Sequence, residues 1–237
     1  TIGCLLNMVK ADSGSIKILG KETAKLTAAD KEKLGVVMDG CPFAEVFNVK
    51  DIKKVISNIY KTFDDEQFEK LIKKFNLPKD KQIKDFSTGM RAKLNIAVAL
   101  SHNAQLLILD EATSGLDPVV RDEILDILLE FVQDENKSIF ISSHITSDLE
   151  KICDYIAFIK NGEIIFVENK DELKDKYALI HCTKQQFAEI DPSAVVGTKQ
   201  TEFNVSALVF KEAVKEGMVA EKPSIEDIML YSTKEAK

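Results

Sequence analysis

The sequence Leu106–Asp117, LLILDEATSGLD, places four large aliphatic residues directly before two adjacent carboxylates. An unbroken apolar run of this length is typical of a strand buried on both faces, as in a parallel sheet covered by helices, because a half-exposed strand would alternate. Asp110 and Glu111 therefore stand where the strand ends. In open α/β sheets, ligands bind at this edge because loops leave the carboxyl ends of the strands there. The stretch predicts an α/β fold with a ligand site beside the two acids.

The segments around this run indicate a mainly parallel sheet. Strands are predicted at residues 34–38 and 138–144, and the second is predicted to be buried and to end in His144. Between the acid pair and this strand, Asp117 can cap a helix that has Pro118 at its first position. A strand, a helix and a strand of these lengths form a βαβ unit with a parallel pair of strands.

A helical region is predicted between these strands. Apolar spacing favours helices between residues 49 and 74, and a further helix follows Ser87. We therefore expect a helical subdomain, inserted into the α/β core over about residues 43–100. Two ordinary surface helices are the simpler alternative.

The end of the chain has a mixed pattern. Residues 170–237 are predicted to form a small α+β extension, and residues 1–169 are predicted to form the core. Strands of the extension are expected near residues 178–182 and 203–209. The last helix is expected from Ser224, because an acid three residues later completes a pattern that resembles a capping box.

The composition excludes several classes of protein. The chain has 237 residues, of which 45% are hydrophobic, and a formal net charge of -7. That charge argues against a general affinity for nucleic acid, which needs a basic face. The four cysteines form no C-x-x-C pair, so neither a zinc site nor a disulfide framework is indicated. No apolar stretch approaches the roughly 20 residues that span a bilayer, so a membrane role must be peripheral.

The acids and the histidine suit nucleoside triphosphate hydrolysis, which needs a metal on the phosphates and a group that orients water. Asp110 is placed to hold Mg²⁺, which prefers hard oxygen ligands. Glu111 could polarise the attacking water, and His144 could hydrogen-bond the γ-phosphate or the same water. Each residue alone is a weak indication, and their order and spacing carry the hypothesis.

The same features resemble the ATP-binding subunits of ABC transporters. Residues 106–111 are similar to the Walker B strand with its catalytic glutamate, and Ser114–Asp117 is similar to the D-loop. Phe86–Met90, FSTGM, stands where that family has its LSGGQ signature, and His144 matches the switch histidine. The phrases LDEATSGLDPVVR and KPSIEDIMLY further resemble the bacterial exporter branch.

The resemblance implies a P-loop NTPase-like fold, ATP with Mg²⁺, and a dimer that sandwiches two ATP molecules. Glu111 and His144 would be catalytic, and Asp110 and Asp39 would contact the metal. A second ATPase subunit, identical or different, and a membrane permease are the implied partners, whereas nucleic acid is not. The implied location is cytoplasmic and peripheral, at the inner face of the cell membrane. The implied nucleotide-binding residues are Ser87, Thr88, Gly89, Met90 and Asp117.

Two departures from the family pattern bear on activity. The phosphate loop, G-x-x-x-x-G-K-[ST], is absent, and Thr1-Ile2 resembles the residues that follow it. Residues 1–237 alone are therefore expected to bind ATP weakly or not at all. We expect the full protein to possess a preceding strand and loop, and a degenerate subunit is the rival explanation. Asp39 replaces the Q-loop glutamine and adds negative charge near Asp110, while Thr88 and Met90 replace a Gly and a Gln.

The leading hypothesis is an ATPase subunit that powers export through a separate permease. One alternative is a soluble ABC-type ATPase that acts on nucleic acid or the ribosome, but this chain shows neither a long coiled-coil insertion nor a paired ATPase domain. Another is a catalytically impaired regulatory subunit. The presence of both Glu111 and His144 argues against that reading.

Overall fold

The apolar run forms the middle strand of a three-stranded parallel sheet. Strand β4 (Leu106–Asp110) pairs with β3 (Leu34–Val37) on one side and with β5 (Ser138–Ser142) on the other. The side chains at residues 107–109 are fully buried, because a middle strand is covered on both faces. The prediction of a buried parallel strand that ends in Asp110 is confirmed.

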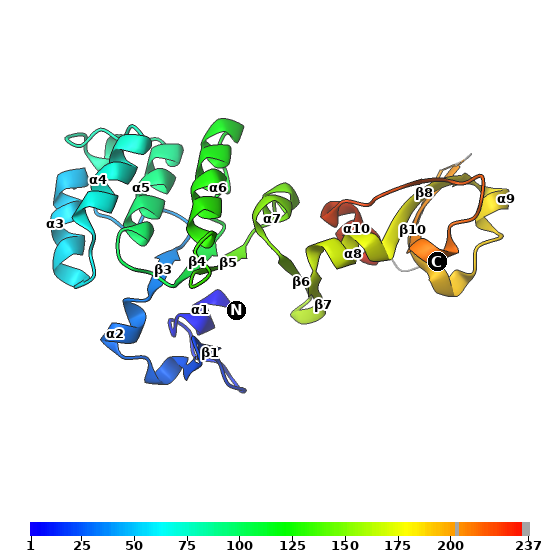
Figure 1. The fold of residues 1–237 in the computed structure, drawn as a ribbon, viewed down its shortest axis with the longest axis horizontal. Coiled ribbons are helices and arrows are strands. Elements are labelled where there is room, and N and C mark those ends of the chain that lie inside the picture. Colours follow the sequence, from blue (N-terminus) through cyan, green and yellow to red (C-terminus); the bar gives the residue numbers. More distant parts are fainter. Residues whose placement is uncertain (202–203, 234–237) are drawn as a thin grey trace. The chain divides into compact units, whose positions relative to one another are not determined.

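The chain divides into two compact units, Thr1–His144 and Ile145–Lys237. This computed structural model describes residues 1–201 and 204–233, and Figure 1 traces their elements. The parallel sheet belongs to the first unit. In the second unit, Ile156 and Leu173 belong to one hydrophobic core. Ile156 lies within the predicted core at residues 1–169, and Leu173 lies within the predicted extension at residues 170–237. The end of the functional core at residue 169 stays a prediction.

Strand β5 differs from the strand predicted at residues 138–144. It ends at Ser142, and Phe140 is 43% exposed, so the prediction of a buried strand is wrong. Within the described part of the chain, β5 pairs only with β4 and is therefore an edge strand with less coverage. His144 follows two residues later, beyond the carboxyl end of the strand.

Four longer helices accompany this sheet, and each begins after a polar side chain that accepts a backbone N–H. They are α3 (Val49–Ile59), α4 (Asp65–Lys74), α5 (Thr88–Leu100) and α6 (Pro118–Val132). The capping residues are Asn48, Asp64, Ser87 and Asp117. Helices α3, α4 and α5 lie within the predicted range 43–100 and side by side in Figure 1, and their assignment to an inserted helical subdomain stays a prediction.

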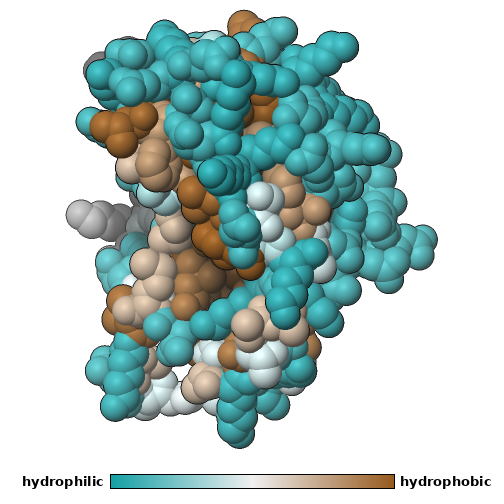
Figure 2. All heavy atoms as spheres, turned by 90° about the vertical axis from the view of Figure 1, so that its left-hand side faces the viewer, coloured by the Kyte–Doolittle hydropathy of each residue, from teal (hydrophilic) through white to brown (hydrophobic). Residues whose placement is uncertain are grey.

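Short elements precede these helices. They are α1 (Ile2–Leu5), β1 (Lys17–Ile18), β2 (Lys21–Glu22) and α2 (Ala28–Lys31). The first unit also has an apolar hollow on the side that carries α3. Figure 2 shows this side, where apolar atoms line a depression between charged side chains. Val55 and Ile59 of α3 are exposed and lie one helical turn apart, on one side of the helix, and Val46 ahead of α3 is exposed too.

The second unit is built on an antiparallel sheet with the strand order β11-β8-β10-β9. One hydrophobic core contains Leu208 of this sheet and Ile228 of the last helix, and a second contains Ile180 and Val205. Since Leu208 and Val205 differ by an odd number of positions along one strand, the two cores cover opposite faces. The sheet strands are β8 (Tyr177–Thr183), β9 (Val195–Gln200), β10 (Asn204–Phe210) and β11 (Val219–Glu221).

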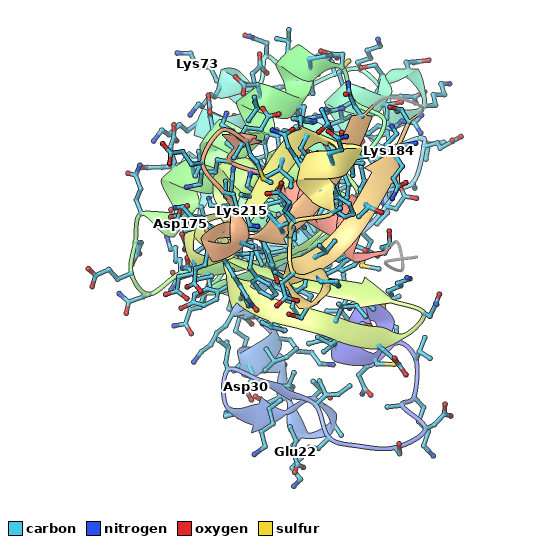
Figure 3. The ribbon with its side chains drawn as sticks, turned by 90° about the vertical axis from the view of Figure 1, so that its right-hand side faces the viewer. Glu22, Asp30, Lys73, Asp175, Lys184 and Lys215 are labelled. Carbon is cyan, nitrogen blue, oxygen red and sulfur yellow. The ribbon has the colours of Figure 1, made fainter. Side chains whose placement is uncertain are left out.

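Helices and one hairpin complete the second unit. Ser224 caps α10 (Ile225–Ser232) in a reciprocal capping box with Asp227, as predicted. Phe203, the first residue of the strand predicted at 203–209, lies outside the described residues. Exposed charged side chains cover this unit, and Figure 3 labels Asp175, Lys184 and Lys215 among them. The other elements are α7 (Thr146–Ile152), β6 (Tyr155–Lys160), β7 (Glu163–Asn169), α8 (Lys170–Lys176) and α9 (Lys184–Phe187). In the part of the chain that the structure describes, no helix combines the length and the apolar character needed to cross a membrane.

Candidate functional site

The carboxyl ends of β4 and β5 bring the predicted site residue Asp110 together with Ser142, which was not predicted. Asp110 and Ser142 are partners in the parallel register, and the hydroxyl of Ser142 donates a hydrogen bond to Asp110 Oδ1 at 2.5 Å. A hydrogen bond to a carboxylate is stronger than one between neutral groups, so Ser142 fixes the orientation of Asp110. Ser142 was not predicted as a site residue, although its position opposite Asp110 follows from pairing the two predicted strands.

Glu111 occupies a left-handed backbone conformation, with φ at +51°. Such a conformation is costly for a residue with a side chain and persists only where neighbouring groups hold it. Two backbone bonds do so: Glu111 N–H donates to the Ser142 carbonyl at 3.1 Å, and Ser114 N–H donates to the Glu111 carbonyl at 3.0 Å. The turn directs Glu111 away from the strand axis, so the adjacent acids face different surroundings.

Glu111 and His144 are in direct contact. Glu111 Oε2 lies 2.6 Å from His144 Nδ1, and the two side chains are 33% and 67% exposed. An ionised carboxylate only accepts hydrogen bonds, so His144 Nδ1 carries a hydrogen and donates a hydrogen bond to Glu111. The ring therefore orients the carboxylate, and Nε2 remains for another group. The structure brings these two predicted catalytic residues together.

The signature-like residues lie at the start of α5. The Ser87 hydroxyl accepts a hydrogen bond from Met90 N–H at 3.2 Å, and both Ser87 and Thr88 are exposed. Gly89 packs against α6, where an added Cβ would come within 3.2 Å of the Val120 side chain. The first turn thus combines exposed N–H donors and a hydroxyl at the positive end of a helix, an arrangement that suits an anion.

Asp117 serves as the cap of α6. Its Oδ1 accepts hydrogen bonds from the N–H groups of Val119 and Val120, both at 3.1 Å. The side chain is exposed and close in sequence to Glu111. Its structural role is therefore established by geometry, and its contact with nucleotide stays a prediction.

Asp39 lies two residues beyond β3 and is exposed. Because Val37 pairs with Leu109 in a parallel register, Asp39, two residues after β3, and Asp110, the last residue of β4, lie toward the same edge of the sheet. The described residues contain no group of three or more His, Cys, Asp or Glu that could hold a metal ion by themselves. Mg²⁺ commonly binds through one or two carboxylates together with phosphate oxygens and water, and these acids fit that mode. Joint contact of the two with one ion stays a prediction.

A second unpredicted residue holds the Asp39 loop. The side-chain amide of Asn95, in the middle of α5, donates a hydrogen bond to the Gly40 carbonyl at 2.7 Å. The two residues are 55 positions apart, and no local pattern links them. The signal in the sequence is a single polar residue within the otherwise apolar stretch at residues 94–99.

Comparison with known proteins agrees with this geometry. The fold is that of ATP-binding subunits: a solved structure titled as the ATP-binding subunit of an ABC transporter has a TM-score of 0.62 at 21% identity, covering 79% of this chain and 75% of that one. A dimeric ATP-binding cassette bound to ADP and phosphate also has a TM-score of 0.62, at 18% identity, covering 71% of this chain and 78% of that one. The predicted P-loop NTPase-like α/β fold is confirmed.

Sequence comparison identifies the family. The ABC transporter family model matches residues 1–114. The lantibiotic transport ATP-binding protein SrtF of Streptococcus pyogenes is 36% identical over 169 residues, which cover 70% of this chain and 72% of SrtF. The chain belongs to the ABC transporter ATP-binding family, and the resemblance drawn from its motifs is confirmed.

Other bacterial relatives are longer than the matched region. The ATP-binding protein YtrB of Bacillus subtilis is 29% identical over 173 residues, 73% of this chain and 59% of YtrB. The bacitracin transport ATP-binding protein BcrA of Bacillus licheniformis is 30% identical over 178 residues, 74% of this chain and 58% of BcrA. The match thus spans just under three fifths of the length of YtrB and of BcrA.

Proposed function

We propose that this chain is the ATP-hydrolysing subunit of an export system. The observation that carries the proposal is the 2.6 Å contact between Glu111 and His144, beside Asp110 at the carboxyl edge of a parallel sheet. This edge is where α/β sheets bind ligands. The names of SrtF and BcrA, which refer to lantibiotic and bacitracin transport, support a role in transport.

The chemistry assigned to Glu111 is activation of water. The water oxygen attacks the γ-phosphorus, the bond from that phosphorus to the bridging β,γ-oxygen breaks, and ADP and phosphate form. Glu111 accepts a hydrogen bond from the attacking water and takes up its proton. His144 keeps the carboxylate in place through Nδ1–H. A protonated ring would also donate from Nε2, to the γ-phosphate, whereas a neutral ring would offer Nε2 as an acceptor to water.

Asp110 and Asp39 are the residues that would hold Mg²⁺. When bound, this ion neutralises charge on the phosphates and so assists their separation. Ser142 supports Asp110 in this role by its 2.5 Å hydrogen bond. The aspartate at position 39 places a carboxylate where the family pattern has a neutral glutamine, which makes the surroundings of the phosphates more negative.

Two surfaces of the first unit suit protein partners. The exposed start of α5, with Ser87 and Thr88, would reach the nucleotide held by a second ATPase subunit, identical or different. The exposed apolar residues Val55 and Ile59 of α3 would contact a cytoplasmic segment of a membrane permease. Figure 2 shows apolar atoms gathered on the side of the first unit that carries α3. Burial of exposed apolar side chains is the main favourable term in such contacts. This arrangement would hold the subunit at the inner face of the cell membrane.

The test compares ATP turnover in two glutamine variants. Because residues 1–237 contain no G-x-x-x-x-G-K-[ST] loop, turnover is measured on the natural gene product. Glu111→Gln is expected to lower turnover by at least about a hundredfold, the usual range for loss of a general base. Glu221→Gln, which alters another glutamate paired with a histidine, should leave turnover unchanged. Equal rates in the wild-type protein and Glu111→Gln would overturn the proposal.

The transport role has its own test. Purification from membranes should recover a membrane protein encoded by a neighbouring gene together with this subunit. A stable soluble complex with RNA, without such a membrane protein, would favour the alternative of an ATPase that acts on nucleic acid or the ribosome.

A further inference from the structure

Asn95 stands out among the buried polar residues of the first unit. Its side chain is 7% exposed and lies on α5 among the apolar residues Leu94, Ile96 and Ala97. The amide nitrogen donates to the Gly40 carbonyl at 2.7 Å, and a carbonyl can only be paired by a donor, which fixes the orientation of the amide.

The other end of this amide is unpaired. Asn95 Oδ1 is buried and has no hydrogen-bond partner among the described residues. An unpaired buried acceptor is costly, so an apolar side chain would be the cheaper occupant of this position if the amide only filled space. The hydrogen bond to Gly40 is therefore the feature that accounts for an asparagine here.

The same face of α5 rests on strand β3. Ala99 lies one turn after Asn95, on the same side of the helix. An added Cβ at Gly35 of β3 would lie 2.7 Å from the Ala99 carbonyl, so helix and strand are in close contact there. Asn95 continues this contact beyond the end of β3, to the loop formed by residues 38–41.

The two ends of this connection are both parts of the proposed site. Asp39 lies in the loop, directly before the glycine whose carbonyl Asn95 binds. Met90, at the other end, lies five residues before Asn95 on the helix, which corresponds to a rise of about 7.5 Å. One helix and one hydrogen bond thus connect the start of α5 to the loop that carries Asp39.

We infer that Asn95 is a positioning residue that ties the Asp39 loop, residues 38–41, to helix α5. The inference rests on the proposed function for its consequence in catalysis, but the tie itself is a property of the ligand-free protein. It makes the position of Asp39 depend on the position of the Ser87–Met90 turn, which the proposed function assigns to the nucleotide of the partner subunit.

The tie can be measured through the thiol of Cys41, which lies in the same loop and is partly buried. The full-length protein is treated with iodoacetamide without nucleotide, and alkylation of Cys41 and Cys4 is followed by mass spectrometry. Asn95→Leu keeps a similar volume and removes the donor. Its Cys41 is expected to react about fivefold faster, as loss of one hydrogen bond predicts, while Cys4 is unchanged.

Asn58→Ala is the matched control, because it removes an amide-to-carbonyl hydrogen bond of 2.6 Å from α3, away from the loop. It should alter neither rate. An unchanged Cys41 rate in Asn95→Leu would overturn the inference. Equal acceleration of Cys41 and Cys4 would also overturn it, since the amide would then support the fold in general.

A kinetic measurement separates positioning from chemistry. In Asn95→Leu, KM for MgATP should rise about fivefold while kcat stays within about twofold, because Asn95 touches no reacting atom. If Glu111→Gln did not reduce turnover, the proposed function would be wrong. The alkylation rates would still test the hydrogen bond from Asn95 to the Asp39 loop. A fall in kcat alone, with KM unchanged, would contradict a positioning role for Asn95.

Discussion

The described residues contain two glutamate–histidine pairs with nearly the same contact distance, one in each unit. Glu111 and His144 are 2.6 Å apart in the first unit, and Glu221 and His181 are 2.7 Å apart in the second. The first pair joins residues that follow the ends of two parallel strands, next to Asp110. The second joins side chains within neighbouring antiparallel strands.

The surroundings of the second pair explain its contacts without a ligand. His181 lies on β8, where it also contacts the Ser206 hydroxyl of β10 at 2.9 Å, and Glu221 lies on β11 on the other side. Cross-strand neighbours on one face of a sheet are expected to form such contacts. A glutamate–histidine pair therefore does not define a site by itself. The first pair differs because it lies at the end of the buried parallel strand β4, with a second acid and a loop beside it, and these additional features support the proposed site.

The largest expected effects come from one glycine in each unit. An added Cβ at Gly35 would clash with Leu107 and the Ala99 carbonyl, and at Gly197 it would clash with the backbone of Tyr231. Each alanine variant is expected to destabilise its own unit by about 1–3 kcal/mol, the usual cost of overpacking. Hydrogen exchange should show faster exchange around residues 34–37 for Gly35→Ala and around residues 195–200 for Gly197→Ala.

This pair of variants also tests the division into two units. Only Gly35→Ala should reduce ATP turnover per folded molecule, because β3 leads into the Asp39 loop. If Gly197→Ala accelerated hydrogen exchange in the first unit as much as in the second, the two units would not be independent in stability.

A smaller effect is expected from the two serines beside the pairs. Ser142→Ala removes the 2.5 Å hydrogen bond to Asp110 and should lower turnover by about tenfold, the effect of losing one hydrogen bond to a charged group. Ser206→Ala removes the contact with His181 and should leave turnover unchanged. Steady-state phosphate release measures both. A comparable loss in the two variants would show that the second pair also serves the reaction.

The smallest effect concerns acid stability in the first unit. Hydrogen bonds from Lys21 at 2.5 Å and from Thr27 hold the pKa of Asp30 well below its usual range. A lowered pKa adds stability above the pKa of the unfolded chain, about 3.9, and this stability is lost as the pH falls further. Asp30→Asn should therefore unfold at a lower temperature than wild type at pH 7, and the difference should shrink between about pH 4 and pH 2. Asp30 is labelled in Figure 3.

A Lys21→Met variant provides the control for this pH dependence. It removes the cation that contacts Asp30. In this background, the difference in unfolding temperature that Asp30→Asn causes should change less between pH 7 and pH 2. A constant difference between wild type and Asp30→Asn from pH 7 to pH 2 would contradict the assignment.

Much of the fold could be predicted because its signals are local. The apolar run at residues 106–109 predicts a buried middle strand, and the caps Ser87, Asp117 and Ser224 mark helices that begin where expected. The exposure of β5 could not be predicted from composition, since Ser138–Ser142 is apolar enough for either an inner or an edge strand. Its place in the sheet depends on which strands pair, and a single segment does not encode that.

The candidate site was predictable in part for the same reason. Asp110 is the last residue of β4, Glu111 and His144 come shortly after β4 and β5, and parallel pairing brings these strand ends together. The left-handed conformation of Glu111 and the bond from Asn95 to Gly40 depend on contacts between distant segments, which leave no periodic pattern. The fold determines the positions of Asp39 and Asp117, and their contacts with metal and nucleotide stay predictions.

The most direct test of the account is a double-mutant cycle on ATP turnover with Glu111→Gln, His144→Ala and the double variant. If His144 acts by holding the Glu111 carboxylate, the two losses are not additive, and the double variant should be about as slow as Glu111→Gln alone. If the loss in the double variant equalled the product of the two single losses, the residues would act independently, and the pair at the end of β4 would not be the working unit proposed here.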